Sequence, residues 1–155
     1  VRDGVVCPDG QGYCLGYVLG PDDVKVEFMG NRAQSMPIQH HHIHFNTPDV
    51  DALRAWYVQM FDAVPGMNGN FKVADLPGVN LRFSETARMQ GTQGRSLDHI
   101  GFEVDNLEAF CRQLEEKGVT FDRPYTRIDE LGIAIAFFTD PDGTYVELTE
   151  GLDNY

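Results

Sequence analysis

The sequence has few basic residues and no long apolar run. It contains 12 Lys and Arg residues against 24 Asp and Glu residues, which gives a formal net charge of −12 at pH 7. This charge disfavours nucleic acid or an anionic membrane as the main partner, because both would repel the chain. No apolar stretch approaches the roughly 18 residues that a membrane-spanning helix needs, so we expect no membrane span.

Cysteine is also scarce, with three residues in the chain. Three are too few for the disulfide framework that holds small secreted domains together. Cys7 and Cys14 could pair with each other, but we expect these two and Cys111 to be free thiols in a reducing compartment. The chain begins at Val1 rather than Met, so we expect a segment to precede it, and a targeting signal could lie there. Because free thiols are typical of a reducing compartment, we expect a cytoplasmic location.

The remaining composition is that of a globular protein, with 42% hydrophobic and 23% charged residues in a length of 155. Such a length supports one domain with a sizeable core. Its most unusual feature is the clustering of four of the five histidines at positions 40, 41, 42 and 44.

The histidine cluster leads into a stretch in which polar and apolar residues alternate, from His42 to Asn46. This period of two is typical of a strand with one apolar face. The fifth histidine, His99, opens a similar stretch 57 residues later, which ends at Glu103. The matching pattern predicts two copies of one structural unit, with a histidine at the same place in each.

Each copy continues with a helix and three further strands. In the first copy, Thr47 and Pro48 are typical of a helix start, with Thr47 as the cap and Pro48 in the first turn. The further strands are predicted at 63–67, 71–76 and 79–84 in the first copy, and near 120–128, 132–139 and 144–149 in the second. We therefore expect an α+β fold of paired βαβββ units, at about 40–84 and 97–149.

Residues 1–36 lie outside the two copies. They are predicted to form a β-hairpin, with strands at 12–19 and 24–28 around a turn at 20–23. The stretch 17–28 matches 137–148 at four of twelve positions, so we interpret the hairpin as the closing half of a preceding unit. The expected domains are 1–36, the hairpin and linker, and 37–155, the paired units.

Alternation along each strand also predicts which side chains share the face that the helices leave open. The polar residues expected on that face are His42, His44, Asn46, Asn80, Arg82, Ser84, His99, Glu103, Tyr145, Glu147 and Thr149. Two neutral imidazoles and one carboxylate can form a divalent-metal site with open coordination positions. His42, His99 and Glu147 are the expected ligands.

Three motifs resemble the vicinal oxygen chelate superfamily, at 42–49, 98–105 and 140–148. Its members include glyoxalase I, methylmalonyl-CoA epimerase, extradiol dioxygenases, and fosfomycin- and bleomycin-resistance proteins. The resemblance implies paired βαβββ modules that form a cup-shaped open barrel. It also places the metal ligands of the family at His42, His99 and Glu147.

The resemblance implies roles for further residues around the metal. A fourth ligand position, often Glu or Gln in glyoxalase- and epimerase-like members, falls near Asn80, whose amide cannot shuttle protons. Extradiol dioxygenases use a tyrosine near the metal, and Phe137 and Phe138 occupy the strand where we would look for it. The candidates are Glu103, His44 and Asn80 for proton transfer or orientation, and Arg82, Asn46 and Phe137 for substrate binding. Arg82 could instead pair with a nearby acid.

These features favour a metal-dependent lyase, isomerase or dioxygenase. Its small-molecule substrate would chelate one divalent ion (Fe, Mn, Ni, Co or Zn) through two neighbouring oxygens. The alternatives are a metal-free cup that binds or sequesters a small molecule, and a structural remnant of a longer multi-module protein. We expect a homodimer, because an uncovered edge of the N-terminal hairpin invites pairing.

Overall fold

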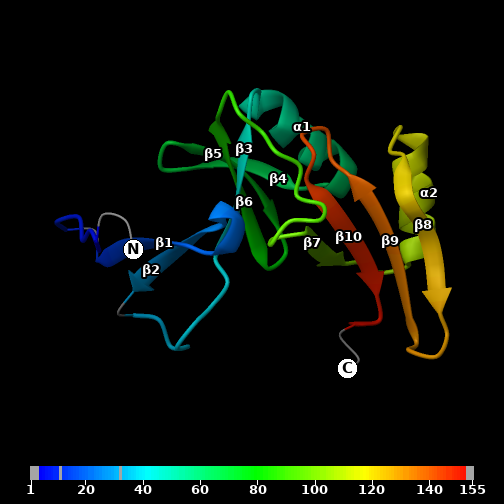
Figure 1. Cartoon of the computed structure of the whole chain (residues 1–155), viewed down its shortest axis with the longest axis horizontal. Helices are drawn as coiled ribbons and strands as arrows, with labels where there is room; N and C mark the ends of the chain where they lie inside the picture. The colour runs from blue at the N-terminus through cyan, green and yellow to red at the C-terminus, as the bar shows by residue number, and fades with distance from the viewer. Residues whose placement is uncertain (1–3, 11, 32, 153–155) are drawn as a thin grey trace. The chain divides into compact units, whose positions relative to one another are not determined.

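The computed structural model describes residues 4–10, 12–31 and 33–152, which form two compact units. The first unit holds the chain up to His40 together with Gly94–Leu97, and the second holds His41–Gln93 and the chain from Asp98 onward. Figure 1 shows the elements of both units.

The first unit is an antiparallel hairpin. In it, β1 (Tyr13–Leu19) pairs with β2 (Lys25–Asn31), and a short 3-10 turn, Pro21–Asp23, joins them. Asp22 and Asp23 take φ angles of 59° and 58°, a left-handed conformation that Asp tolerates better than most residues. The predicted hairpin is therefore confirmed, while its origin as half of a preceding module stays a prediction.

A disulfide ties this hairpin to the segment before it. Cys7 and Cys14 are bonded, with their Cα atoms 4.1 Å apart. Two backbone hydrogen bonds between Val6 and Leu15, of 2.8 and 2.7 Å, bring the segments together. The expectation of three free thiols is therefore wrong for this pair, because a strand pairing that the sequence did not reveal sets the two cysteines side by side. Cys111 is free and buried.

The second unit contains two four-stranded sheets, each with one helix (Figure 1). The first has the order β3-β6-β5-β4 and consists of β3 (His42–Thr47), α1 (Val50–Phe61), β4 (Val64–Asn68), β5 (Phe71–Leu76) and β6 (Val79–Glu85). The second has the order β7-β10-β9-β8 and consists of β7 (His99–Glu103), α2 (Leu107–Glu116), β8 (Phe121–Ile128), β9 (Ile133–Thr139) and β10 (Tyr145–Glu150). In each sheet the first and last strands are parallel neighbours. The paired βαβββ units are thus confirmed.

The helices cover one face of each sheet. Leu81 and Phe83 of β6 are buried beneath α1, and Val146 and Leu148 of β10 are buried beneath α2. Met60 of α1 packs into the cluster of the second sheet. The two modules therefore share core contacts instead of folding as separate domains. Within the described residues no ladder of hydrogen bonds joins the two sheets, so the arrangement is open.

The start of α1 differs from its prediction. Asp49 is the N-cap, and its carboxylate accepts a hydrogen bond from the backbone N–H of Ala52 at 3.0 Å. Thr47 is the last residue of β3 and is 1% exposed, and its hydroxyl accepts from the N–H of Asp49 at 3.1 Å. Thr47 therefore joins the strand to the cap. Neither α1 nor α2 is a candidate for a membrane span in the part of the chain that is described.

Candidate metal centre

His99 and Glu147 meet on neighbouring parallel strands. Glu147 lies opposite Gly101 in the pairing of β10 with β7. Its neighbours Val146 and Leu148 are fully buried on the helix side, so Glu147 points to the open face. Oε2 of Glu147 lies 3.1 Å from Nε2 of His99. The structure therefore brings these two of the three expected ligands together.

The other ring nitrogen of His99 is held by Asp98. Nδ1 of His99 lies 2.9 Å from Oδ1 of Asp98. A proton on Nδ1 satisfies this contact and leaves Nε2 with a lone pair directed toward the open face. Metal-binding histidines are commonly oriented by a carboxylate in this way. Asp98 was not among the candidates from the sequence, because it precedes β7 and the strand alternation does not place it.

The spacing of His99 and Glu147 fits a shared divalent ion. Ligand bonds of about 2.0–2.2 Å to imidazole nitrogen and carboxylate oxygen set two adjacent ligand atoms about 3 Å apart. The observed separation of 3.1 Å between Nε2 and Oε2 agrees with this value. The same separation also suits a hydrogen bond from a protonated ring to the carboxylate. Titration with a metal ion distinguishes a pair that shares an ion from a pair that is only hydrogen-bonded.

Aromatic rings line the surroundings of His99. The ring centroid of Phe137 lies 5.7 Å from that of His99, and that of Tyr145 lies 6.4 Å away. Phe137 and Tyr145 stack on each other at 5.2 Å. Burial, with smaller contributions from Asp122 and Asp98, raises the pKa of the Tyr145 phenol. Tyr145 therefore remains a hydrogen-bond donor at neutral pH, two residues before Glu147 on the same strand.

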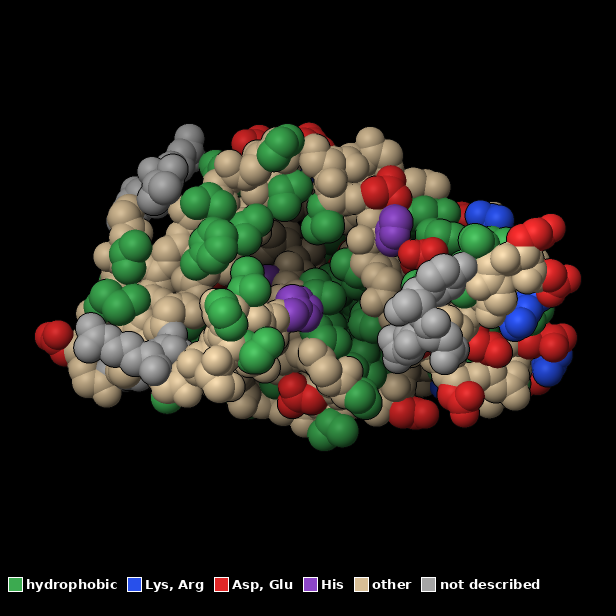
Figure 2. Space-filling view, turned by 90° about the horizontal axis from the view of Figure 1, so that it is seen from below, with side chains coloured by type: hydrophobic (Ala, Val, Ile, Leu, Met, Phe, Trp, Pro, Cys, Tyr) green, Lys and Arg blue, Asp and Glu red, His purple; other side chains and the backbone are tan. Residues whose placement is uncertain are grey.

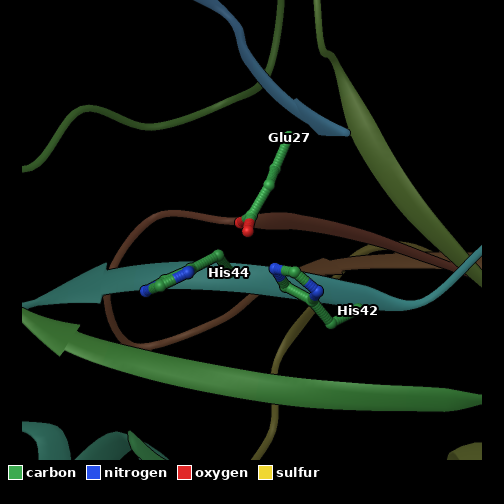
Figure 3. A group of neighbouring side chains, drawn as sticks. All are labelled: Glu27, His42 and His44. Atoms are coloured by element: carbon green, nitrogen blue, oxygen red, sulfur yellow. The ribbon is translucent and has the colours of Figure 1, made fainter. Parts of the chain in front are cut away.

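His42 and His44 form a second group of potential ligands, on β3. Figure 3 shows their side chains along this strand, and one ring nitrogen of each lies within 4.8 Å of the other. Nε2 of His44 lies 2.7 Å from the hydroxyl of Ser84. Nδ1 of His42 lies 2.8 Å from Nδ1 of His41. Glu27, labelled in the same view, belongs to the first unit.

The three expected ligands lie on two different sheets. Among the residues that the structure describes, His42, His99 and Glu147 do not form a group whose ligand atoms all lie within 4.8 Å of one another. Their sharing of one ion therefore stays a prediction. It requires the open faces of two sheets to meet, either within one chain or between two copies of it.

The polar candidates on β6 contact one another. Asn80 lies opposite His42, and Arg82 lies opposite His44. The amide nitrogen of Asn80 donates to Asp75 at 2.6 Å, and its oxygen accepts from Nε of Arg82 at 3.0 Å. The amide of Asn80 is thus occupied in orienting Arg82.

Glu103 and Asn46 lie at the far ends of their strands. Glu103 accepts hydrogen bonds from the Thr149 hydroxyl and from the backbone N–H groups of Gly151 and Leu152. Four residues of extended strand separate it from His99, which corresponds to about 13 Å. The structure therefore does not bring Glu103 to His99, and Glu103 anchors the chain after β10. Asn46 is exposed, opposite Ser84.

Comparison with known proteins identifies relatives of this chain. Residues 41–148 match the family model described as the Glyoxalase/Bleomycin resistance protein/Dioxygenase superfamily. A stretch of 54 residues is 44% identical to a lactoylglutathione lyase of Schizosaccharomyces pombe, and covers 35% of this chain and 17% of that protein. A stretch of 61 residues is 40% identical to a lactoylglutathione lyase of Pseudomonas aeruginosa, and covers 39% of this chain and 32% of that protein. The matches thus span less than a third of either relative.

The solved structure of the oxidase ChaP-H2 resembles this chain with a TM-score of 0.61 at 21% sequence identity. The likeness covers 75% of this chain and 95% of that one. At this level of identity, the likeness establishes the shared fold of paired modules.

Proposed function

The chain belongs to the Glyoxalase/Bleomycin resistance protein/Dioxygenase superfamily, and from this premise we propose that it is a metal-dependent enzyme. It would act, as a lyase, isomerase or dioxygenase, on a small molecule that chelates a divalent ion through two neighbouring oxygens. The contact of 3.1 Å between His99 and Glu147 carries the proposal. The partial matches to two lactoylglutathione lyases favour the lyase class.

The proposed ligands are His99 and Glu147, with His42 as a third. When bound, a divalent ion supplies Lewis-acid stabilisation of negative charge on substrate oxygens. Asp98 keeps the proton of His99 on Nδ1, so that Nε2 is available. Phe137 and Tyr145 exclude water from one side of the site, because their stacked rings form an apolar wall beside His99.

His44 is the proposed acid–base residue of the site. Its ring lies next to that of His42 on the open face of β3, with the centroids 5.9 Å apart. The Ser84 hydroxyl contacts Nε2 of His44 and orients the ring. A histidine that is held in this way, while it is still exposed, can accept a proton and return it during the reaction.

Calorimetric titration of protein stripped by a chelator tests the proposal. The untagged parent should bind Mn²⁺, Fe²⁺, Co²⁺, Ni²⁺ or Zn²⁺, and His99→Ala should abolish tight binding because it removes a ligand. Asp98→Asn should weaken binding by about 10- to 100-fold, since it removes only the carboxylate that orients His99. His40→Ala, a change outside the pair, is the matched control and should bind like the parent.

Two results would overturn the proposal. The first is a parent that binds none of these ions, and the second is a His99→Ala variant that binds as tightly as the parent. Either result would give preference to a metal-free cup that binds its small molecule directly.

A further inference from the structure

The two sheets can be compared position by position, because the first and last strands of each are parallel neighbours. His44 and Gly101 are equivalent, since each follows the matching histidine of its copy, His42 or His99, by two residues. Glu147 lies opposite Gly101, and Arg82 lies opposite His44. Arg82 is therefore the counterpart of Glu147.

Burial gives the same alignment. Arg82 stands between Leu81 and Phe83, which are 0% and 2% exposed. Glu147 likewise stands between two fully buried residues of β10. Asn80, near which the family resemblance places the fourth ligand position, lies two residues before Arg82 on β6. A guanidinium thus occupies the place where the other module carries its metal-binding carboxylate.

The side chain of Arg82 is held in place on the open face of β6. Its Nε donates to Asn80, which is fixed in turn by Asp75. Its guanidinium carbon lies 5.7 Å from the ring centroid of Phe71, within reach of a cation–π interaction. These contacts fix the plane of the guanidinium and occupy Nε, but they leave both terminal nitrogens available.

Arg82 has no carboxylate partner among residues 4–10, 12–31 and 33–152, whereas Arg54, Arg95 and Arg112 each form an ion pair. On the face that Figure 2 shows, basic side chains gather at the right, toward α2 and β8, while acidic side chains are spread more widely. An oriented guanidinium without an acid, in a chain with a net charge of −12, indicates an external anion.

We infer that Arg82 binds a carboxylate of the substrate, so that the substrate is a small organic acid. The planar fork of a guanidinium matches the two oxygens of a carboxylate and binds them with two parallel hydrogen bonds. The substrate would thus supply the carboxylate that the protein lacks at this position. This inference rests on the proposed function, because it assigns a further substrate-binding residue to the same site.

The test compares two acids, lactate and mandelate, with their uncharged amides, lactamide and mandelamide. The amides keep two neighbouring oxygens but lack the charge. In the metal-free parent, the Nε–H signal of Arg82 in a ¹H–¹⁵N spectrum should shift on addition of the acids and not of the amides. This readout does not depend on bound metal, so it separates failure of this inference from failure of the metal site.

Calorimetry on the metal-loaded protein gives the second readout. Arg82→Gln should weaken binding of the acids by about 10- to 100-fold, because it removes a charge-assisted hydrogen-bonding pair. It should leave binding of the amides and of the metal ion unchanged. Arg112→Gln, an exposed arginine paired with Glu108 on α2, is the matched control and should bind all ligands like the parent.

The inference is wrong if acids and amides bind equally well to the parent. It is also wrong if Arg82→Gln keeps the affinity for the acids. If Arg82 only supports the fold, Arg82→Gln would lower the melting temperature without discriminating between an acid and its amide.

Discussion

Cys111 is free and buried, and the chemistry of its thiol follows from this position. It is 4% exposed on α2, and burial, together with the nearby Glu115, raises the pKa of the thiol to about 11. Because only the thiolate reacts rapidly, native protein without reductant should show no fast-reacting thiol with Ellman's reagent. Unfolding in guanidinium should release one thiol per chain, and subsequent reduction should release the pair Cys7 and Cys14.

The same assay tests the disulfide of the first unit. If more than one thiol reacts on unfolding without reductant, Cys7 and Cys14 are reduced, as expected for a protein of the cytoplasm. Alkylation during cell lysis should be used to prevent oxidation in air, so that the count reports the state in the cell.

One buried hydrogen bond joins elements of the two modules. The hydroxyl of Tyr57 on α1 donates to Asp140, which precedes β10, at 2.9 Å. The other oxygen of Asp140 accepts from the backbone N–H groups of Asp142 and Thr144. Tyr57→Phe leaves one carboxylate oxygen unpaired, and should lower the free energy of unfolding by about 1–3 kcal/mol at neutral pH in urea. Tyr125→Phe is the control, since Tyr125 is only half-buried.

The effect of Tyr57→Phe should depend on pH. Burial raises the pKa of Asp140, so the folded protein binds its proton more tightly than the unfolded chain does. The contribution of Asp140 to stability is therefore most favourable below the unfolded pKa, and it declines as pH rises through the folded pKa. A neutral carboxyl group loses less than a carboxylate when its hydrogen-bonding partner is removed, so the loss caused by Tyr57→Phe should shrink as pH falls through this range. A loss that is equal at all pH values would contradict the role of Tyr57.

At the scale of the whole molecule, we predict a homodimer in which each metal centre combines His42 of one copy with His99 and Glu147 of the other. The dimer is expected because the two ligand groups lie on separate sheets. Sedimentation should then give twice the mass of the chain. His42→Ala and His99→Ala should each fail to bind metal tightly. Mixing the two variants with exchange of subunits should restore about a quarter of the sites of the parent, as twofold symmetry requires.

Either of two outcomes would contradict this arrangement. A monomeric parent that binds metal would place all three ligands in one chain. A dimer whose mixed variants recover no metal site would also place all three ligands in one chain. His40→Ala mixed with His99→Ala provides the control for the site count: about half of the parent's sites should remain, with or without exchange of subunits, because half of the chains keep every ligand.

Strand alternation was sufficient to predict the faces of the sheets but not the pairing between strands. Leu81 and Val146 lie beneath the helices as the period of two required. Lateral register between strands cannot be read from alternation, so the family resemblance places the fourth ligand position near Asn80, whereas the strand pairing selects Arg82. It also missed the contact of Cys7 with Cys14, because a single bridged pair outside a strand leaves no periodic signal.

The order β7-β10-β9-β8 places β10, which is synthesised after the other three strands of its sheet, between two of them. Until residues 145–150 leave the exit tunnel, β7 and β9 each present an unpaired edge to other nascent chains. The second sheet therefore cannot close before β10 has been synthesised. A nonsense codon just before Tyr145 would yield a product with two open edges that chaperones and proteases recognise.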